Sequence, residues 1–244
     1  MTIRDAIDVR TSRRSYLEQD LTTSQLEKMN KLINQFNKIG GFKIQLVTND
    51  GKAFKGFSRS YGMFKGVCHY FVFIADTSDL HADEKIGYYG QLLVLHATTL
   101  GLGTCWVGGT FSKSKTPVTL SNNERIACLI TIGMTPEENT KKEKFIHKLT
   151  HRKSKTAEQM YHSDTAVPKW FHDGMLAVTK APSAMNQQPV CFTYQNKKTT
   201  AMLLPNKKHF VDMDLGIAKL HFEIGAGGGT WNWGKEGRFK QLVS

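Results

Sequence analysis

The chain has 244 residues, 40% of them hydrophobic, which is enough to bury a substantial core and too apolar for a disordered protein. Lys and Arg number 33 against 21 Asp and Glu, so the formal net charge is +12 and an anionic partner is expected, such as a nucleotide, a phosphorylated cofactor, RNA or an acidic membrane. The four cysteines form no C-x-x-C pair, which indicates a reducing compartment. A charged N-terminus and the lack of any long apolar run predict a soluble, cytoplasmic protein.

Residues 10–16 read RTSRRSY and follow a short apolar stretch that includes Ile3 and Val9. Arg10, Ser12 and Arg14 alternate along this segment, which we call the clasp. A guanidinium group offers phosphate or carboxylate a planar fork of donors, and a serine hydroxyl or backbone N–H adds a further contact. The clasp therefore predicts an anion site, with a solvated surface run as the alternative.

The next segments predict a unit of helices and strands. Apolar residues recur at helical spacing over 24–36, and Thr22, Thr23 or Ser24 can cap this helix. A second, largely apolar helix is expected over 86–103, with glycines at its end. Strands are expected over 42–48, 69–76 and 124–134, the last stopped by Thr135 and Pro136.

The basic stretch KKEKFIHKLTHRKSK, residues 141–155, divides the chain as a linker or an extended arm. We expect one half over 1–155 and a shorter half over 156–244. In the second half, Pro168 marks the first turn of a helix, a hairpin turns at Asn196 and Lys197, and DLGIAKLHFEIGAGGG predicts another helix that runs into glycines.

Two pairs of segments echo each other across these halves. GQLLVLHATTLGLGTCW and GIAKLHFEIGAGGGTW each run from a glycine through an apolar helix to a glycine-rich exit. FKIQLVTNDGK and VCFTYQNKKT each read as a strand, a polar turn and a lysine. The echoes predict an internal duplication, with two similar lobes about a pseudo-twofold axis.

Two further motifs complement the clasp. GLGTCWVGGTF, residues 101–111, contains Gly108 and Gly109, which let a backbone approach a planar ring because no Cβ intervenes. APSAMNQQP, residues 181–189, is a polar turn between two prolines whose amides can donate and accept hydrogen bonds. Together the three motifs could surround a flat, phosphorylated ligand.

Other candidates favour structural interpretations. His147 and His151 lie one helical turn apart, but no third ligand is near them in the sequence, so we expect no metal site. Cys105 is expected to be a buried, inert thiol. GAGGGT is not a dinucleotide fingerprint because no strand precedes it.

With these motifs the chain resembles the FMN-dependent nitroreductase family, most closely its subgroup with two nitroreductase-like halves in one chain. RTSRRSY matches the family's R-x-S-x-R, GLGTCWVGG its G-L-G-T-x-W-x-G-G, APSAMNQQP its A-P-S-x-x-N-x-Q-P, and LSNNERIACLITIGM its buried strand ending in glycine. The resemblance implies an α+β, nitroreductase-like fold.

The order of the motifs departs from the family pattern. In ordinary members the A-P-S-x-x-N-x-Q-P turn precedes the G-L-G helix and reaches the FMN of the partner subunit, whereas here it follows. The first half has NKIGGFKIQLV in that place, and the second half lacks the clasp. We infer an internally duplicated chain that mimics the family homodimer, acting as a monomer, with a homodimer as the alternative.

The resemblance also implies residue roles. Arg10 and Ser12 would hold the FMN phosphate, and Arg14 would lie near the pyrimidine edge of the flavin, where a cation stabilises the reduced form. The remaining expected cofactor-binding residues are Trp106, Val107, Gly108 and Gly109 against the ring, with the Gly109 N–H near flavin N5; Pro182, Ser183 and Asn186 over the ribityl chain and ring edge; and Arg152 and Lys153 at the phosphate. Ala184 and Val190 depart from the usual serine and aromatic residue, which would widen or weaken that wall of the pocket.

The implied activity is that of an FMN-dependent NAD(P)H nitroreductase-like oxidoreductase. By a ping-pong mechanism, NADH or NADPH would reduce the flavin and a nitroaromatic or quinone-type acceptor would then reoxidise it, with no side chain as catalytic acid or base in the first half-reaction. Two alternatives stay open. The basic stretch 141–155 would suit a nucleic-acid-binding protein, and the chain could be a flavin-binding protein without turnover.

Overall fold

The computed structural model describes residues 1–55, 63–140, 143–144, 154–205 and 209–242. The chain divides into two compact units. The N-terminal unit comprises residues 9–82 and 93–149, and the C-terminal unit comprises residues 1–8, 83–92 and 150–244. Both units combine helices with an antiparallel or mixed sheet, so the expected α+β class is confirmed.

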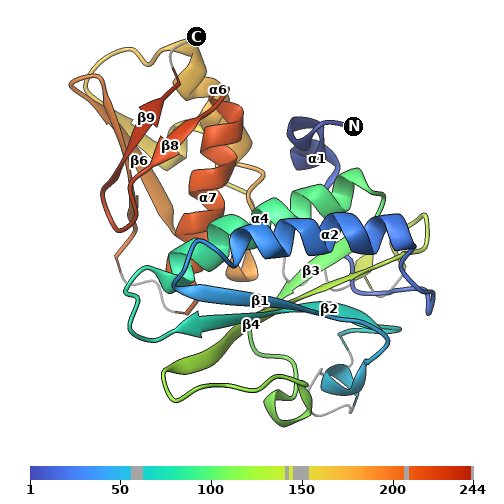
Figure 1. Ribbon diagram of the computed structural model, residues 1–244. Helices are drawn as coiled ribbons and strands as arrows, with labels where there is room; N and C mark the ends of the chain where they lie inside the picture. Colours follow the sequence, from blue (N-terminus) through green and yellow to red (C-terminus); the bar gives the residue numbers. More distant parts are fainter. Residues whose placement is uncertain (56–62, 141–142, 145–153, 206–208, 243–244) are drawn as a thin grey trace. The chain divides into compact units, whose positions relative to one another are not determined.

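The N-terminal unit is built on a four-stranded antiparallel sheet of order β1-β2-β4-β3. Helix α2 lies over one face of this sheet (Figure 1). Its elements are α2 (Thr23–Phe36), β1 (Phe42–Val47), η1 (Lys52–Phe54), β2 (His69–Asp76), the end of α4 (Ala82–Thr99), β3 (Gly103–Val107), η2 (Lys113–Lys115) and β4 (Glu124–Gly133).

The apolar run HYFVFIAD forms β2, between β1 and β4. Alternate side chains of a strand point to opposite faces, so both faces of β2 need apolar residues when both are covered. Tyr70 and Val72 pack into one cluster with Leu129 of β4. On the other face, Phe73 stacks against Trp106 of β3 at a centroid distance of 6.0 Å.

The observed ends of α2 and α4 agree only in part with the ends expected from the sequence. Thr22 caps α2 in a capping box with Gln25, one of the three expected caps. The expected helix over 86–103 exists but begins at Ala82 and ends at Thr99. Gly101 follows with a φ of 75°, a left-handed conformation that suits glycine at a helix end, whereas Gly103 already belongs to β3.

The C-terminal unit contains a five-stranded sheet of order β5-β6-β7-β9-β8, in which β5 and β6 are parallel and the other pairs antiparallel. Its elements are most of α1 (Ile3–Val9), the start of α4, η3 (Glu158–Met160), β5 (Tyr161–Ser163), α6 (Lys169–Val178), η4 (Ala184–Asn186), β6 (Val190–Gln195), β7 (Lys198–Leu203), α7 (Val211–Gly225), β8 (Gly229–Trp231) and β9 (Gly237–Gln241).

Aromatic side chains fill the core of the C-terminal unit. Phe222 of α7 contacts Phe171 of α6, Phe192 of β6 and Phe239 of β9 with ring centroids 5.1–5.3 Å apart. The expected hairpin between β6 and β7 is confirmed, because Asn196 and Lys197 adopt φ values of 50° and 58° in a two-residue turn. Two boundaries differ from expectation: Pro168 is the N-cap of α6, and α7 begins at Val211.

The two sheets share one topology. In each unit a helix leads into two strands, a second helix and two more strands, and the strands pair in the order first, second, fourth, third. Helix α2 with β1 to β4 thus corresponds to α6 with β6 to β9, apart from the added strand β5.

Among the described residues, no helix is long and apolar enough to cross a membrane.

Candidate functional site

The clasp lies in the N-terminal unit beside β3, the edge strand of its sheet. Ser12 forms a parallel bridge with Thr104, and the N–H of Arg13 donates to the carbonyl of Thr104 at 2.9 Å. The N–H of Lys65 donates to the carbonyl of Arg14, also at 2.9 Å. These hydrogen bonds hold residues 12–16 extended, so successive side chains point in opposite directions.

In this extended segment the side chain of Arg13 lies on the opposite side from those of Ser12 and Arg14. It is buried, its Nη2 donates to the carbonyl of Pro136 at 2.7 Å, and its Nε donates to Glu143 Oε1 at 3.3 Å. Arg13 therefore fixes the extended segment to the loop after β4, and its side chain is not available to a ligand.

The carboxylate of Glu143 holds the backbone of the clasp through hydrogen bonds. Its Oε1 accepts the N–H groups of Arg14 at 2.6 Å and Ser15 at 3.1 Å, and its Oε2 accepts the N–H of Thr140 at 2.8 Å. Burial raises the pKa of this carboxyl, but the hydrogen bonds to the ionised form outweigh burial, and the pKa is lowered overall. Glu143 stays ionised at neutral pH and fixes the backbone between the clasp side chains.

The buried thiol of Cys105 on β3 donates to the carbonyl of Trp106 at 3.5 Å. Burial raises the pKa of this thiol, against the opposing effects of Arg14, Arg10 and Ser12, so the thiol is neutral at physiological pH. A neutral thiol leaves the charge of the two arginines uncompensated by Cys105.

The side chain of Arg10, in the N-terminal unit, has a buried hydrogen-bond donor. Its Nε is buried and has no hydrogen-bond partner among the residues that the structure describes. Burial also lowers the pKa of this guanidinium, although an arginine stays protonated under all physiological conditions. An unpaired buried donor on a cation is costly, and an anionic acceptor would remove that cost. The clasp therefore fits the phosphate of a cofactor.

The glycine loop follows β3 directly. Trp106 is half-buried against Phe73, and Val107 is 2% exposed within the core, so the side chains of both pack inside the unit. Gly109 is exposed, and a Cβ built on it would meet no atom within 4 Å. This loop can therefore offer a ligand its backbone at Gly108 and Gly109 rather than the side chains that precede them.

The third motif lies in the C-terminal unit between α6 and β6, and we call residues 181–189 the turn. Three of its residues carry side chains at positive φ: Met185 at 52°, Asn186 at 50° and Gln188 at 44°. Left-handed backbone at residues other than glycine costs energy, and such strain concentrates at functional sites. Asn186 also lies near Ser154, with its Nδ2 3.5 Å from the hydroxyl.

Side chains hold the turn in this shape. The N–H of Gln188 donates to the hydroxyl of Ser183 at 2.9 Å, and the side chain of Gln188 accepts the N–H of Lys155 at 2.8 Å. At the other end, the N–H of Ala184 donates to both carboxylate oxygens of Asp214, at 3.1 and 3.2 Å.

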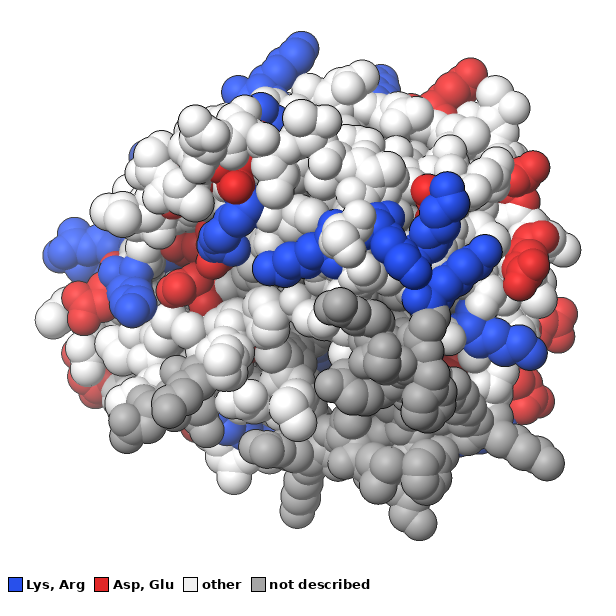
Figure 2. Space-filling view, turned by 90° about the horizontal axis from the view of Figure 1, so that it is seen from below, with Lys and Arg blue, Asp and Glu red and all other residues white. Residues whose placement is uncertain are grey.

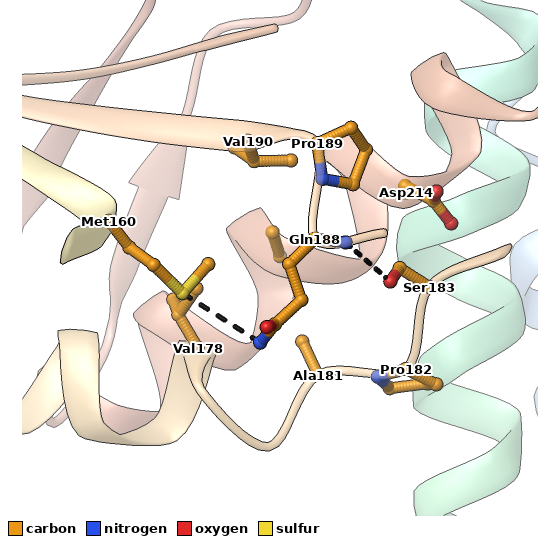
Figure 3. A pocket seen from close by; sticks show the side chains of 10 residues that line it. Met160, Val178, Ala181, Pro182, Ser183, Gln188, Pro189, Val190 and Asp214 are labelled. Atoms are coloured by element: carbon orange, nitrogen blue, oxygen red, sulfur yellow. Dashed lines mark hydrogen bonds between the residues drawn. The ribbon is translucent and has the colours of Figure 1, made fainter. Parts of the chain in front are cut away.

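A small cavity lies behind the turn (Figure 3). Pro182, Ser183 and Gln188 line it from the turn, and Asp214 lines it from α7. Its volume is about 10 Å³, which is room for about one water molecule and far too small for a flavin ring. The cavity is thus a space that the turn covers, and not the place of a large ligand.

Other expected residues are not assigned by the geometry. Arg152 and Lys153 lie outside the described residues, as do His147 and His151. Within the described part of the chain, no three His, Cys, Asp or Glu side chains are grouped as metal ligands would be. The clasp and the glycine loop belong to the N-terminal unit, and the turn belongs to the C-terminal unit.

The sequence interpretation missed Glu143 and Asp214 as supporting residues. Glu143 is the lone acid in the basic stretch 141–155, and Asp214 is an acid between Met213 and Leu215, both of which are buried. An acidic residue in a basic or apolar setting is the signal that could have identified each of them, because a carboxylate in such a place needs donors.

Comparisons with known proteins identify a family and a shared fold for this chain. A family model described as "Putative TM nitroreductase" matches residues 2–226. The crystal structure of a nitroreductase, itself named putative, from Thermotoga maritima is 18% identical, with a TM-score of 0.66 over 100% of this chain and 94% of that chain. No curated protein matches the chain.

Two other solved structures match over part of the chain. An FMN-dependent nitroreductase from Clostridium difficile is 20% identical, with a TM-score of 0.44 over 61% of this chain and 97% of that chain. A nitroreductase with bound FMN from Bacteroides fragilis is 13% identical, with a TM-score of 0.45 over 57% of this chain and 91% of that chain. At these identities, the Thermotoga likeness establishes a shared fold and no more.

Proposed function

Since the chain belongs to the "Putative TM nitroreductase" family of oxidoreductases, we propose that it is an FMN-dependent NAD(P)H oxidoreductase. The proposed donors are NADH and NADPH, and the proposed acceptors are nitroaromatic or quinone-type compounds. Support comes from the three motifs and from the clasp geometry. Two solved nitroreductases with partial matches are also named for FMN.

The buried, unpaired Nε of Arg10 is the observation that carries this proposal. Arg10 and Ser12 would bind the FMN phosphate, with the backbone fixed by Glu143. Arg14 would place its charge near the flavin ring. Because the clasp is braced before any ligand arrives, little conformational entropy is lost on binding.

The remaining proposed contacts come from backbone and turn. Trp106 and Val107 would hold the glycine loop through their packing, and the N–H of Gly109 would face the flavin. Pro182, Ser183 and Asn186 would cover part of the cofactor. Arg152 and Lys153 are proposed phosphate ligands on the sequence resemblance alone. Bound FMN would supply the redox chemistry, accepting a hydride from the nicotinamide and passing electrons to the acceptor.

We further infer that the two units are duplicated halves and that one chain suffices for FMN binding. The shared strand order supports this inference, as does the complementary loss of the clasp and the turn between the halves. Light scattering of the FMN-loaded protein should give a monomer with one FMN per chain. A homodimer that binds FMN and a monomer that does not would contradict it.

The test of the site is FMN retention in variants. Arg10→Ala should weaken FMN binding about tenfold or more, because it removes a charge-assisted contact to the phosphate. Arg238→Ala, an exposed arginine on β9, is the matched control and should bind FMN normally. Fluorescence quenching of added FMN measures both. Equal affinity of the two variants would defeat the assignment of the clasp.

A basic surface keeps nucleic-acid binding as a second candidate. Four lysines are exposed at two short helices: Lys52 and Lys55 at η1, and Lys113 and Lys115 on η2. The N–H of Ser112 donates to the carbonyl of Ala53 at 2.8 Å, which joins these two helices. Lys and Arg side chains also gather on the face viewed in Figure 2. Retention on nucleic acid that falls steeply with salt, in a protein that binds no flavin, would favour this candidate.

A further inference from the structure

Asp214 is a buried carboxylate to which the proposed activity gives no role. It lies in the first turns of α7, is 5% exposed, and follows Met213, which is 3% exposed. A buried carboxylate is unfavourable unless donors compensate for the lost water. Here the compensation comes from the turn, because the N–H of Ala184 donates to both oxygens of Asp214.

Ala184 is the residue at which the turn changes direction. Ser183 precedes it with extended backbone, and Met185 and Asn186 follow it with positive φ. The hydrogen bonds of Gln188 and Lys155 hold the far end of the turn. Asp214 therefore holds the near end of the turn, at the residue that precedes Met185. Figure 3 shows Asp214 on α7 and Ser183 in the turn.

We propose that Asp214 is a positioning residue for FMN binding, whose ionised carboxylate holds Ala184, and with it Ser183 and Asn186, in the shape that contacts the cofactor. Protonation of Asp214 removes the charge from both acceptor oxygens and loosens the turn. This inference rests on the proposed function. FMN affinity would then depend on the ionisation of Asp214 as well as on that of the FMN phosphate.

The buried environment of Asp214 brings the protonation of its carboxylate near neutral pH. Burial raises the pKa of Asp214 to about 7, against the opposing effect of the Ala184 N–H. Charged groups on α4, on α7 and at the two ends of the turn have other partners: Glu84 pairs with Lys219, Lys155 bonds to Gln188, and Lys180 pairs with Asp8. Asp212, on the same helix, is exposed.

The same helix offers a matched control. Burial also raises the pKa of Glu223 to about 7, but this carboxyl accepts its hydrogen bond from the hydroxyl of Tyr88 at 2.8 Å and makes no contact with the turn that the structure records. Glu223→Gln therefore removes a carboxyl that titrates in the same range without touching Ala184. Asp214→Asn removes the charge at the turn and keeps one acceptor oxygen.

The first experiment measures FMN affinity by fluorescence quenching at pH 6 and pH 8 in the wild type and both variants. The wild type and Glu223→Gln should bind FMN about fivefold more tightly at pH 8, the advantage of a charged over a neutral acceptor, beyond any change seen in Asp214→Asn. The FMN phosphate titrates near pH 6 in all three proteins, so the difference between the curves isolates Asp214. Identical curves for the wild type and Asp214→Asn would overturn the inference.

The second experiment needs no cofactor. Amide hydrogen exchange of the segment 179–189 is compared between the wild type and Asp214→Asn at the same pH, so the intrinsic pH dependence of exchange cancels. At pH 8 the variant should exchange faster, and at pH 6 the two should agree. Equal exchange at pH 8 would contradict the positioning role. A wild type that shows this exchange difference but binds no FMN would instead contradict the proposed function.

Discussion

The two units share a strand order but differ in the segment between their first helix and first strand. In the N-terminal unit, residues 37–41 connect α2 to β1, and the left-handed positions fall on Gly40 and Gly41. In the C-terminal unit the longer turn places Met185 and Asn186 at such positions. Glycine adopts this backbone without strain, whereas a residue with a side chain is retained there at a cost. One strand order thus accommodates two connections that differ in length and in backbone strain.

Each unit also buries an ion pair, and in the N-terminal unit that pair is Arg13 with Glu143, which lies outside the hydrophobic cluster of the sheet. The sheet cluster of the N-terminal unit consists of hydrophobic side chains such as Val72 and Leu129. The C-terminal unit buries Lys219 and Glu84, with Lys219 fully buried. Buried charges need defined partners, so the C-terminal unit is expected to tolerate fewer substitutions at these positions.

Breaking the buried ion pair should have the largest effect on stability. Lys219→Met leaves the buried carboxylate of Glu84 without its cationic partner, and the free energy of unfolding should fall by about 3–5 kcal/mol. The double variant Glu84→Gln with Lys219→Met should recover most of this loss, because no buried charge remains. Urea denaturation measures both. A double variant less stable than the single one would show that the pair itself stabilises the unit.

Removing the brace of the clasp should have an intermediate effect. Glu143→Gln loses the charge that accepts from Arg14 and Ser15, and the free energy of unfolding should fall by about 2 kcal/mol at pH 7. The pKa of Glu143 is lowered in the folded protein, so its stabilisation is present at neutral pH and is lost as the pH falls through that pKa. The wild type and the variant should therefore converge in acid.

Glu138→Gln is the control for this prediction. The Glu138 side chain is 88% exposed and pairs with Lys144 at 3.4 Å, so its loss should change stability by less than about 0.5 kcal/mol. Similar losses in both variants would mean that the contacts of Glu143 do not stabilise the clasp.

Relieving the strained turn should have the smallest effect. Met185 is exposed and has a φ of 52°, so Met185→Gly should raise the free energy of unfolding by about 0.5 kcal/mol. Gln187, with a φ of −75°, gives the opposite case, and Gln187→Gly should lower stability by a similar amount. Thermal unfolding distinguishes the two signs. A loss in Met185→Gly would show that its side chain makes contacts that outweigh the strain.

The sequence predicts the frame of this protein better than its supporting contacts. Strand β2 is found where HYFVFIAD indicates it, because a short run rich in aromatic and β-branched residues is typical of a buried strand. The expected end of α4 is too late because Gly101 and Gly103 cannot be distinguished in the sequence. In the structure only Gly101 has the left-handed backbone of a helix end, and Gly103 belongs to β3. The contacts of Glu143 with the clasp and of Asp214 with the turn join residues distant in sequence, so no local pattern identifies these contacts.

The visible absorption spectrum of the purified protein shows whether the chain is a flavoprotein that nicotinamides reduce. FMN is added, and then NADPH or NADH without oxygen. We expect two flavin bands that shift on binding and bleach when the nicotinamide is added. A protein that acquires no bound flavin would contradict the proposed function and leave the basic surface without an assigned ligand.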